Sequence, residues 1–402
     1  MNILFLSISK IKKISERGIY TDLIREFRNR GNNVYVVSPR ERRYKKRTEF
    51  SNEEGINILR IKTGNITKIN LIEKGISTLL IEKQFLYGIK KYFNNIVFDL
   101  IIYSTPPVTF EKIVQYVKER DNARSYLILK DIFPQNAVDL GLLKKGGLIY
   151  RHFRKKEINL YKLSDFIGCM SQANVDYIIR NNPFLEQFNI EVCPNSIEPI
   201  DNVVIEKKEK NKIRENYCIP KDAIVLIYGG NLGKPQCIDF LIKILKSNKN
   251  REDIYFLIIG SGTEYLKLKN HIDKNGYMNA KLYPYLPKEE YDELVPACDV
   301  GLILLDPRFT IPNFPSRLLT YMEFSMPVIA ATDVNTDLGK IIMEGEFGYW
   351  CECGDINGFN KILGKLCTNS QLLLWMGKKA RDYFDRNYII SKAYDIIVNH
   401  FK

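Results

Sequence analysis

An arginine directly after a Pro-Ser pair is the residue whose position points most clearly to chemistry. Arg317 lies in the first turn of the helix expected within NFPSRLLTYMEFSMPVIA, residues 313–330. A cation at that end is opposed by the helix dipole unless an anion lies beside it, so we predict that a phosphate binds there. A merely solvated arginine is the alternative. The residues before it, with Ser316 as the expected N-cap, would form one wall of the site: Asn313, Phe314, Pro315 and Ser316.

Glycine-rich loops follow two successive strand patterns and could bind the same phosphate. The first is YGGNLGKPQ, residues 228–236, and the second ends the next strand as IIGSG, residues 258–262. Backbone N–H groups in such loops bind anions, and Lys234 adds a positive charge. A tight structural turn is the alternative for either loop. The residues that we assign to phosphate binding here are Gly230, Asn231, Gly260 and Gly262.

Gly18 closes the first loop of the chain, SISKIKKISERG, just before a helical pattern. A glycine there lets the backbone approach a ligand, and a helix N-terminus favours anions. The loop lacks the GxGxxG spacing of dinucleotide-binding folds, so a plain turn between strand and helix is an equal alternative.

Histidine and cysteine are too dispersed to predict a metal site or a nucleophile triad. The three histidines, His152, His271 and His400, stand far apart, and the eight cysteines lack the paired two-residue spacing of zinc sites. We therefore expect no metal, no cofactor and reduced thiols. No run of about 18 uncharged apolar residues occurs, so no transmembrane helix is expected.

Short apolar runs alternate with amphipathic stretches along the chain. NILFLSI and DLIIYST in the first half, and AIVLIYGG and PVIAA in the second, read as strands. Strands that alternate with helices predict doubly wound parallel sheets, with ligands beyond the carboxyl ends of the strands. A turn-rich segment divides two Rossmann-like domains, residues 1–198 and 199–383, which we expect to face a central cleft. The sequence permits the C-terminal helix, residues 384–402, to pack back onto the first domain.

Segments of both halves resemble a known enzyme family. YGGNLGKPQCIDFLIKIL, FLIIGSGTEYLKLK, KLYPYLPKEEYDELVPACDVGLILL and FPSRLLTYMEFSMPVIA resemble the donor domain of retaining GT-B glycosyltransferases of the family-4 group. In the first half, YLILKDIFPQNAVDLGLL and IYRHFRKKEINLYKLSDFIGCMSQANVDYI resemble a bacterial subgroup that builds O-antigen, capsule and related polysaccharides, among them N-acetyl-fucosaminyl transferases. The resemblance covers nearly the whole chain and implies the GT-B fold.

The resemblance also implies a UDP-sugar donor. The residues that it places against the uracil are Tyr283, Tyr285 and Leu286. Many members carry two glutamates with seven residues between them, the second gripping the ribose, at positions that here are Pro312 and Thr320. Thr320 can bond one ribose hydroxyl. Glu323 is also assigned to donor binding, although it lies a turn away on the wrong side of the helix for a simple exchange.

Four residues are assigned to catalysis or sugar contact. Lys234 and Arg317 are the remaining cations of the donor loops, because the Arg and Lys that often hold the diphosphate in the family are matched by Asn231 and Gln236. In the first half, Lys130 and Asp131 stand where the family has a histidine near the cleft, and we expect them to contact the acceptor or the donor sugar.

Positive charge gathers in the first half. Residues 1–163 hold 32 Lys and Arg against 16 Asp and Glu, or +16, whereas the rest of the chain, with 28 against 31, carries −3. This asymmetry predicts an anionic partner. Residues 144–162, KKGGLIYRHFRKKEINLYK, mix basic and apolar side chains as helices on anionic membranes do, a solvated helix face being the alternative. The residues assigned to membrane or acceptor binding are Arg151, Arg154, Lys155 and Lys156.

Together these features predict a retaining, metal-independent glycosyltransferase. It would move an N-acetylated or deoxy sugar, such as N-acetyl-fucosamine, from a UDP-sugar to a polyprenyl-diphosphate-linked saccharide. We expect it in the cytoplasm, peripheral at the anionic inner face of the cell membrane, with no nucleic-acid partner. Two alternatives stay open: a sugar-nucleotide epimerase of the same fold, and a non-catalytic protein that binds membrane or nucleic acid.

Overall fold

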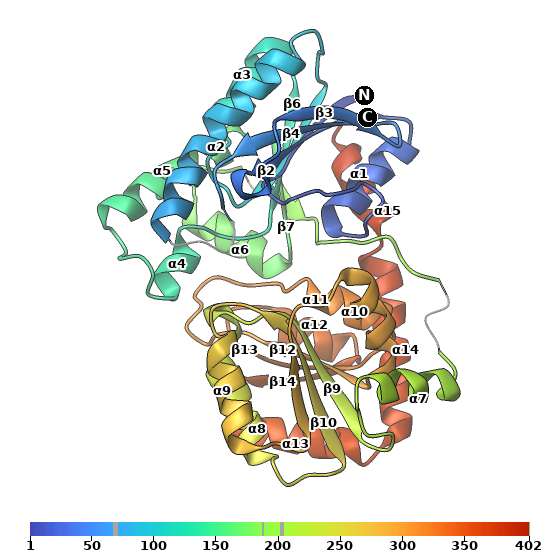
Figure 1. Cartoon of the computed structure of the whole chain (residues 1–402). Coiled ribbons are helices and arrows are strands. Elements are labelled where there is room, and N and C mark those ends of the chain that lie inside the picture. The colour runs from blue at the N-terminus through green and yellow to red at the C-terminus, as the bar shows by residue number, and fades with distance from the viewer. Residues whose placement is uncertain (67–70, 187–188, 202–204, 402) are drawn as a thin grey trace. The chain divides into compact units, whose positions relative to one another are not determined.

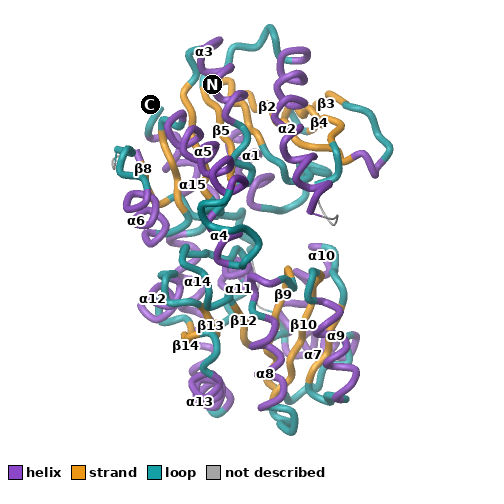
Figure 2. The backbone as a smooth tube through the Cα atoms, turned by 90° about the vertical axis from the view of Figure 1, so that its left-hand side faces the viewer, coloured by secondary structure: helices purple, strands orange, loops and turns teal. Residues whose placement is uncertain are grey.

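The chain divides into two compact units, each built on one sheet. The computed structural model describes residues 1–66, 71–186, 189–201 and 205–401. Unit 1 comprises Met1–Glu198 and Ile390–Lys402, and unit 2 comprises Pro199–Ile389 (Figure 1). In each unit, helices lie on both sides of the sheet (Figure 2). The predicted fold class, two Rossmann-like α/β domains, is therefore confirmed.

Unit 1 contains an eight-stranded sheet. In spatial order its strands are β3 (Glu49–Glu53), β4 (Ile56–Thr63), β2 (Asn33–Glu41), β1 (Asn2–Leu6), β5 (Leu100–Thr105), β6 (Arg124–Leu129), β7 (Phe166–Cys169) and β8 (Ile190–Val192). All neighbours pair in parallel except β3 with β4. Every residue of β5 is buried, as expected for a parallel strand that is covered on both faces.

The helices of unit 1 include one from the end of the chain. They are α1 (Ile19–Asn29), α2 (Leu71–Tyr92), α3 (Glu111–Asp121), α4 (Gln135–Asp139), α5 (Leu148–Leu163), α6 (Gln172–Asn181) and α15 (Ile390–Asn399). Helix α15 packs on α1, where the rings of Phe27 and Tyr394 lie 4.9 Å apart. The N–H of Ile390 donates to the carbonyl of Ile197 at 2.9 Å, which ties the C-terminal segment to unit 1.

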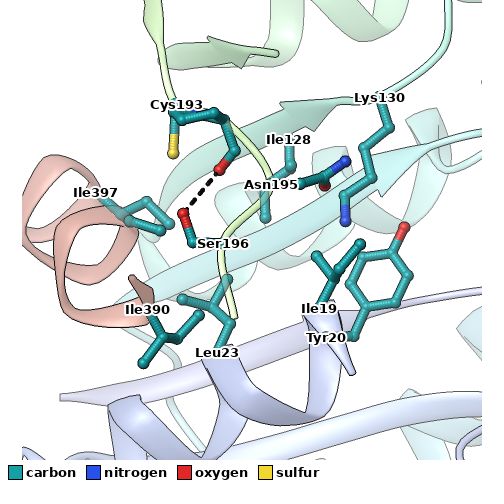
Figure 3. Close-up of a pocket in the computed structure, with 12 residues that line it drawn as sticks. Ile19, Tyr20, Leu23, Ile128, Lys130, Cys193, Asn195, Ser196, Ile390 and Ile397 are labelled. Carbon is teal, nitrogen blue, oxygen red and sulfur yellow. Dashed lines mark hydrogen bonds between the residues drawn. The ribbon is translucent and has the colours of Figure 1, made fainter. Parts of the chain in front are cut away.

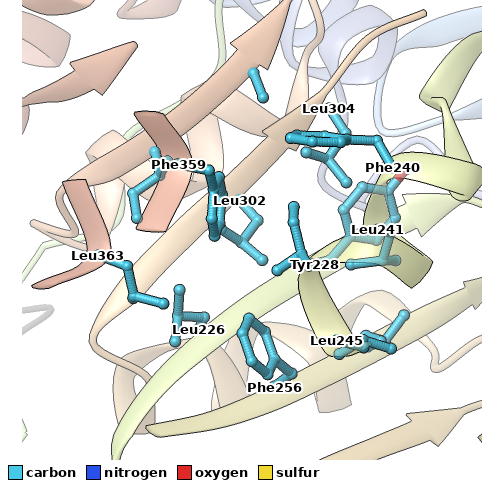
Figure 4. Close-up of a cluster of buried hydrophobic side chains, with 14 of the residues drawn as sticks. Leu226, Tyr228, Phe240, Leu241, Leu245, Phe256, Leu302, Leu304, Phe359 and Leu363 are labelled. Carbon is cyan, nitrogen blue, oxygen red and sulfur yellow. The ribbon is translucent and has the colours of Figure 1, made fainter. Parts of the chain in front are cut away.

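Unit 2 contains a six-stranded sheet in which all neighbours are parallel. In spatial order its strands are β11 (Ala280–Tyr283), β10 (Ile254–Ser261), β9 (Ile224–Asn231), β12 (Val300–Leu304), β13 (Val328–Thr332) and β14 (Gly348–Glu352). Leu226, Phe256 and Leu302 from three of these strands pack with Phe240 and Phe359 from two helices (Figure 4). This core fixes the carboxyl ends of the strands, from which the glycine-rich loops leave.

Unit 2 has eight α-helices among the residues that the structure describes. They are α7 (Lys207–Asn216), α8 (Ile238–Ser247), α9 (Tyr265–Asn275), α10 (Lys288–Leu294), α11 (Arg317–Glu323), α12 (Leu338–Glu344), α13 (Ile356–Cys367) and α14 (Ser370–Asn387). Helix α14 continues to Asn387 and packs on α11, so residues 384–389 belong to unit 2. The residues from Ile390 onward belong to unit 1.

Two features of the fold differ from the sequence-based expectation. The short strand β3 was not predicted; it pairs antiparallel with β4 and is largely exposed at the sheet edge, so it has no apolar pattern. Helix α7 was not predicted either, and it begins with the charged segment KKEKNK, residues 207–212, which follows the predicted domain boundary. Arg214 anchors this helix, since its buried guanidinium bonds Asp299 Oδ2 at 2.6 Å and three backbone carbonyl groups besides that of Ala297.

Candidate functional site

The guanidinium of Arg317 lies over an aromatic ring at the carboxyl end of β9. Its central carbon is 4.2 Å from the ring centroid of the buried Tyr228. Burial opposes the charge, but the neighbouring Tyr228 and Tyr321 hold the pKa of Arg317 above its ordinary value. Among the residues that the structure describes, none accepts a hydrogen bond from the buried Nη1. A buried donor without a partner is costly, so this cation is arranged for an anion from outside the chain.

The loop after β9 passes directly beside this guanidinium. Gly230 has φ +126°, and a Cβ added there would lie 3.5 Å from Nη2 of Arg317. Asn231 is exposed, and its amide donates to Gln236 Oε1 at 2.8 Å. Lys234 follows on the exposed side of the same loop. The loop therefore presents backbone and a lysine next to the buried arginine, which suits a diphosphate.

Gly260 and Gly262 have a different role from Gly230. A Cβ on Gly260 would lie 1.9 Å from the carbonyl oxygen of Gly230, and one on Gly262 would lie 2.2 Å from that of Leu232. Gly260 lets the end of β10 lie against the end of β9, and Gly262 lets the next residues pack against Leu232 just after β9. The geometry thus supports the structural turn that the sequence left as their alternative.

Tyr321 joins the arginine helix to the glycine loop. Its hydroxyl accepts from the N–H of Gly229 at 3.2 Å and lies 3.1 Å from the carbonyl oxygen of Ile227 and 3.3 Å from that of Leu302. It is one helical turn after Arg317, on the same face. Sequence reasoning missed this residue; the i, i+4 spacing from Arg317 was the available signal.

The other residues of the 313–330 segment are partly structural. Ser316 is at the N-cap position, but its side chain makes no capping bond, and α11 is only seven residues long. Phe314 is buried, with its ring 6.0 Å from that of Tyr388. Asn313 accepts a bond from the hydroxyl of Thr336 on its backbone carbonyl at 2.7 Å. Pro315 accepts from the N–H of Leu318, so the segment holds α11 in place.

Thr320 and Glu323 lie in different environments on α11. Thr320 is partly exposed. Glu323 is fully buried, and its Oε1 accepts from the N–H of Ile200 at 2.9 Å. The structure gives Glu323 a role in fastening the start of unit 2 onto α11, which is why it does not replace the missing family carboxylate.

The segment expected to hold the base follows the edge strand β11. The hydroxyl of Tyr283 donates to the carbonyl of Tyr217 at 2.7 Å, and the two rings pack edge to face. Tyr285 is 65% exposed and Leu286 is partly exposed. Tyr285 is therefore an accessible aromatic face at the carboxyl end of the sheet.

Gly18 has its backbone engaged within unit 1. Its N–H donates to Asp22 Oδ1 at 2.8 Å, and its carbonyl accepts from the N–H of Asp22. Asp22 is buried and pairs with Arg25 at 2.7 Å. A carboxylate of the chain itself already lies at this helix start, which favours the plain turn over a phosphate-binding role for Gly18.

Lys130 and Asp131 directly follow β6 in unit 1, but their side chains differ in surroundings. Nζ of Lys130 lies 3.8 Å from the ring centroid of Tyr20, and burial lowers the pKa of this lysine to about 7. Asp131 is held within its own loop, since its Oδ1 accepts from Asn136 at 2.7 Å and its carbonyl from Thr105 at 3.1 Å.

The four basic residues assigned on α5 divide into two pairs. Arg154 bonds Glu157 Oε2 and Asn182 Oδ1, both at 2.6 Å, and Lys156 bonds Glu111 Oε2 at 2.9 Å. Arg151 and Lys155 are exposed. Of the four assigned residues, only this second pair is exposed, because Arg154 bonds Asn182 at the end of α6 and Lys156 bonds Glu111 at the start of α3.

The described residues contain neither a metal-binding cluster nor a membrane-spanning helix. No group of three His, Cys, Asp or Glu side chains in the described ranges could hold a metal ion. Within those same ranges, every helix is too short or too polar to cross a membrane.

Comparisons with known proteins bear on this geometry. Residues 209–383 match the family model described as "Glycosyl transferases group 1". The probable glycosyltransferase WbjE of Pseudomonas aeruginosa is 24% identical over 326 residues, covering 80% of this chain and 78% of that protein. The putative colanic acid biosynthesis glycosyl transferase WcaI of Escherichia coli K12 is 20% identical over 245 residues, 60% of each chain.

A solved structure shares the fold of the whole chain. The crystal structure of Anabaena HepE in complex with UDP superposes with a TM-score of 0.71 at 14% identity, covering 100% of this chain and 99% of that one. Arg317 and both glycine loops lie within the residues that match the family model. The match to the group 1 model covers most of unit 2, and the relatives along the chain are glycosyltransferases, so the protein is a glycosyltransferase with the GT-B fold.

Proposed function

We propose that the protein transfers a sugar from a UDP-sugar to a polyprenyl-diphosphate-linked saccharide, with retention and without a metal, in bacterial surface polysaccharide synthesis. The observation that carries the proposal is the buried, unpartnered Nη1 of Arg317 beside the Gly230 loop. UDP in the HepE complex and the colanic acid pathway named for WcaI support the choice of donor and pathway.

Arg317 would act on the leaving group. In the transfer, the acceptor oxygen bonds to the anomeric carbon, the bond from that carbon to the β-phosphate oxygen breaks, and the acceptor proton passes to the departing phosphate. Negative charge grows on the β-phosphate as its bond to the anomeric carbon breaks, before the acceptor proton arrives. A fixed cation in a partly buried site stabilises such charge without reorganising solvent, and Lys234 would add to it from the exposed side.

The accessible face of Tyr285 would take the uracil, and Thr320 would bond one ribose hydroxyl. Tyr285 supports this because it is exposed at the carboxyl end of β11. Thr320 is partly exposed one turn along α11 from Arg317. The donor sugar would be N-acetylated or deoxy, such as N-acetyl-fucosamine, as the sequence resemblance implies.

Helix α5 would dock the enzyme on the anionic inner face of the membrane. Leu148 is 85% exposed and Ile149 is 59% exposed at its start, and the exposed Arg151 and Lys155 lie on the following turns. Apolar and cationic side chains exposed together suit a surface of anionic lipids. This docking would bring the lipid-linked acceptor to unit 1.

Ligand binding and transfer test the donor. UDP should raise the unfolding temperature of the protein by mass action, with uridine as the control that lacks the diphosphate and ADP as the control for the base. UDP-sugars should then be screened with a short-prenyl diphosphate-linked N-acetylhexosamine in the presence of EDTA. A protein that binds UDP no better than uridine would contradict the proposal. Isomerised sugar without an acceptor would instead favour the epimerase.

Sedimentation with lipid vesicles tests the proposed docking of α5 on the membrane. The protein should sediment with vesicles that contain phosphatidylglycerol and not with phosphatidylcholine alone. Reversing Arg151 and Lys155 to Glu should release it, whereas the same reversal of the exposed Lys207 and Lys208 on α7 should not. Equal release by both double variants would show that net charge, and not α5, determines binding.

A further inference from the structure

A cysteine lies where the glycine-rich loop after β9 joins helix α8. Cys237 occupies the N-cap position of α8 with φ +44°, and its side chain is partly exposed. The preceding residue, Gln236, is bonded to the loop, because its Oε1 accepts from Nδ2 of Asn231 at 2.8 Å and from the N–H of Gly233 at 3.3 Å. A movement of Cys237 would therefore be passed to the backbone of this loop.

A second cysteine lies at the start of the neighbouring helix. Cys353 follows β14 directly, precedes α13 and is 5% exposed. Helices α8 and α13 pack on each other, with the rings of Phe240 and Phe359 6.2 Å apart. Both helices begin at the carboxyl ends of parallel strands, which meet at one edge of the sheet. Cys353 belongs to the apolar core of unit 2, and Cys237 packs against that core.

The two thiols are joined by a hydrogen bond. This bond lowers the pKa of the Cys237 thiol, although burial acts in the opposite direction. The same bond, together with burial, raises the pKa of Cys353. The proton that the pair shares therefore stays on Cys353, and Cys237 ionises first. Because the thiolate is the nucleophilic form of cysteine, the more accessible of the two sulfurs is also the more reactive one.

Such a pair is oxidised by a hydroperoxide in two steps. The thiolate of Cys237 attacks one peroxide oxygen, the O–O bond breaks, and the departing oxygen takes up a proton and leaves as an alcohol or as water. The sulfur of Cys353 then attacks the sulfenic acid on Cys237, which forms the S–S bond and releases water. In total the two thiols lose two electrons and two protons, which the hydroperoxide accepts.

We propose that Cys237 and Cys353 are a site of reversible oxidation, at which a hydroperoxide closes a disulfide that weakens binding of the nucleotide donor. A small thiol reopens the disulfide by exchange. The oxidation site stands independently of the proposed transfer, whereas its effect on UDP rests on that function.

Closure displaces the glycine-rich loop because the two partners are held with different firmness. An S–S bond is about 2 Å long, which is shorter than the hydrogen bond that it replaces. Cys353 is buried, and its N–H donates to the carbonyl of Thr332 at 2.8 Å. Cys237 has a left-handed backbone, which a cysteine rarely adopts, and it is partly exposed. Cys237 therefore moves toward Cys353, and Gln236 transmits the displacement to the loop.

Mass spectrometry tests the site without an assay of transfer. Reduced protein is treated with hydrogen peroxide, denatured, alkylated with iodoacetamide and digested with trypsin and a protease that cleaves after Glu352, which separates Cys353 from Cys351. We expect two peptides linked through Cys237 and Cys353, which dithiothreitol separates. Cys353→Ser should instead leave a sulfenic acid on Cys237 that dimedone traps. If both cysteines are fully alkylated after peroxide treatment, the proposal is overturned.

Titration calorimetry with UDP tests the consequence for the donor. The oxidised wild type should bind UDP at least about fivefold more weakly than the reduced wild type, and dithiothreitol should restore the affinity. Cys237→Ser should bind UDP equally before and after peroxide treatment. Cys218→Ser is the matched control, because Cys218 is exposed and lies outside the pair, and this variant should lose affinity as the wild type does. Equal affinities of the linked and the reduced wild type would refute the proposal.

The two experiments separate this failure from a failure of the proposed function. If the reduced protein binds UDP but peroxide yields no linked peptides, the donor function stands and the oxidation site is wrong. If the reduced protein does not bind UDP, the transferase proposal falls, and the linked peptides still decide whether Cys237 and Cys353 form the disulfide.

Discussion

Arg317 in unit 2 and Lys130 in unit 1 are two versions of the same arrangement. Lys130 directly follows β6, and Arg317 lies beside Gly230 at the carboxyl end of β9. Each lies over a tyrosine ring, Arg317 at 4.2 Å and Lys130 at 3.8 Å from the ring centroid (Figure 3 shows Lys130 and Tyr20). Neither is perturbed by a carboxylate among the described residues. Each cation is therefore partly stabilised by its own unit and left available to a ligand.

The two cations differ in how firmly they hold their charge. The pKa of Arg317 is raised despite desolvation, and a guanidinium stays protonated in proteins. Burial lowers the pKa of Lys130 to about 7, so this ammonium gives up its proton within the physiological range. A permanent charge suits a diphosphate, whereas the charge of Lys130 depends on pH near neutrality.

The largest expected effect is on UDP binding, which should depend on Arg317 and not on Lys130. Arg317→Met should remove the thermal shift caused by UDP and lower transfer at least about 100-fold, because truncating one partner of a buried charge pair costs several kcal/mol. Arg251→Met is the control, since Arg251 pairs with Asp253 at the opposite end of β10. Lys130→Met should keep the UDP shift. If both the Arg317 and the Lys130 variants lost the thermal shift caused by UDP, the two cations would not differ in their role in UDP binding.

A smaller effect tests whether the shape of the guanidinium matters. Arg317→Lys keeps the charge but loses the planar pair of donors that can bond two phosphate oxygens. UDP affinity, measured by isothermal titration calorimetry, should fall about tenfold. If this variant bound UDP with wild-type affinity, only the charge at position 317 would matter for binding and not the shape of the guanidinium.

The pH dependence of stability tests the lysine. The folded pKa is about 7 and the ordinary value is 10.5, so between these values the unfolded chain binds one more proton than the folded chain. The free energy of unfolding should therefore rise with pH across this window, by up to about 1.4 kcal/mol per pH unit from this group.

Urea unfolding of the wild type and Lys130→Met between pH 6.5 and 9.5 measures this slope. The stability of the wild type relative to the variant should improve as pH rises. Arg317→Met should show no such pH-dependent difference from the wild type. A constant difference for Lys130→Met would mean that the lysine keeps its ordinary pKa.

The smallest effect concerns the support behind Arg317. Tyr321→Phe removes the hydroxyl that joins α11 to Gly229 and Ile227. Stability should fall by about 1–2 kcal/mol, and UDP affinity should fall a few fold as the loop loosens. Tyr277→Phe is the control, because it removes a bond to His271 outside the site. A stability loss without any change in affinity would make Tyr321 purely structural.

The sequence predicted those site residues whose signal lies within one short segment of the chain. Arg317 was identified because its conflict with a helix start is local, whereas Lys130 was identified only because the resemblance places it where the family has a histidine. The pairing of Arg154 with Glu157 is also local, but its bond to Asn182 crosses from α5 to the end of α6. No spacing within the 144–162 segment could show which basic residues turn inward.

The sequence by itself determined two α/β units, since buried parallel strands and amphipathic helices each leave a pattern within a few residues. It also determined the glycine loops and the arginine beside them. Only the tertiary structure decided that Tyr228 and Tyr321 lie beside this arginine, that Gly260 and Gly262 serve close packing, and that the ring of Tyr20 lies beside Lys130. These contacts join residues that are far apart in the chain, and such proximity follows from the order of strands in the sheet and not from any local pattern.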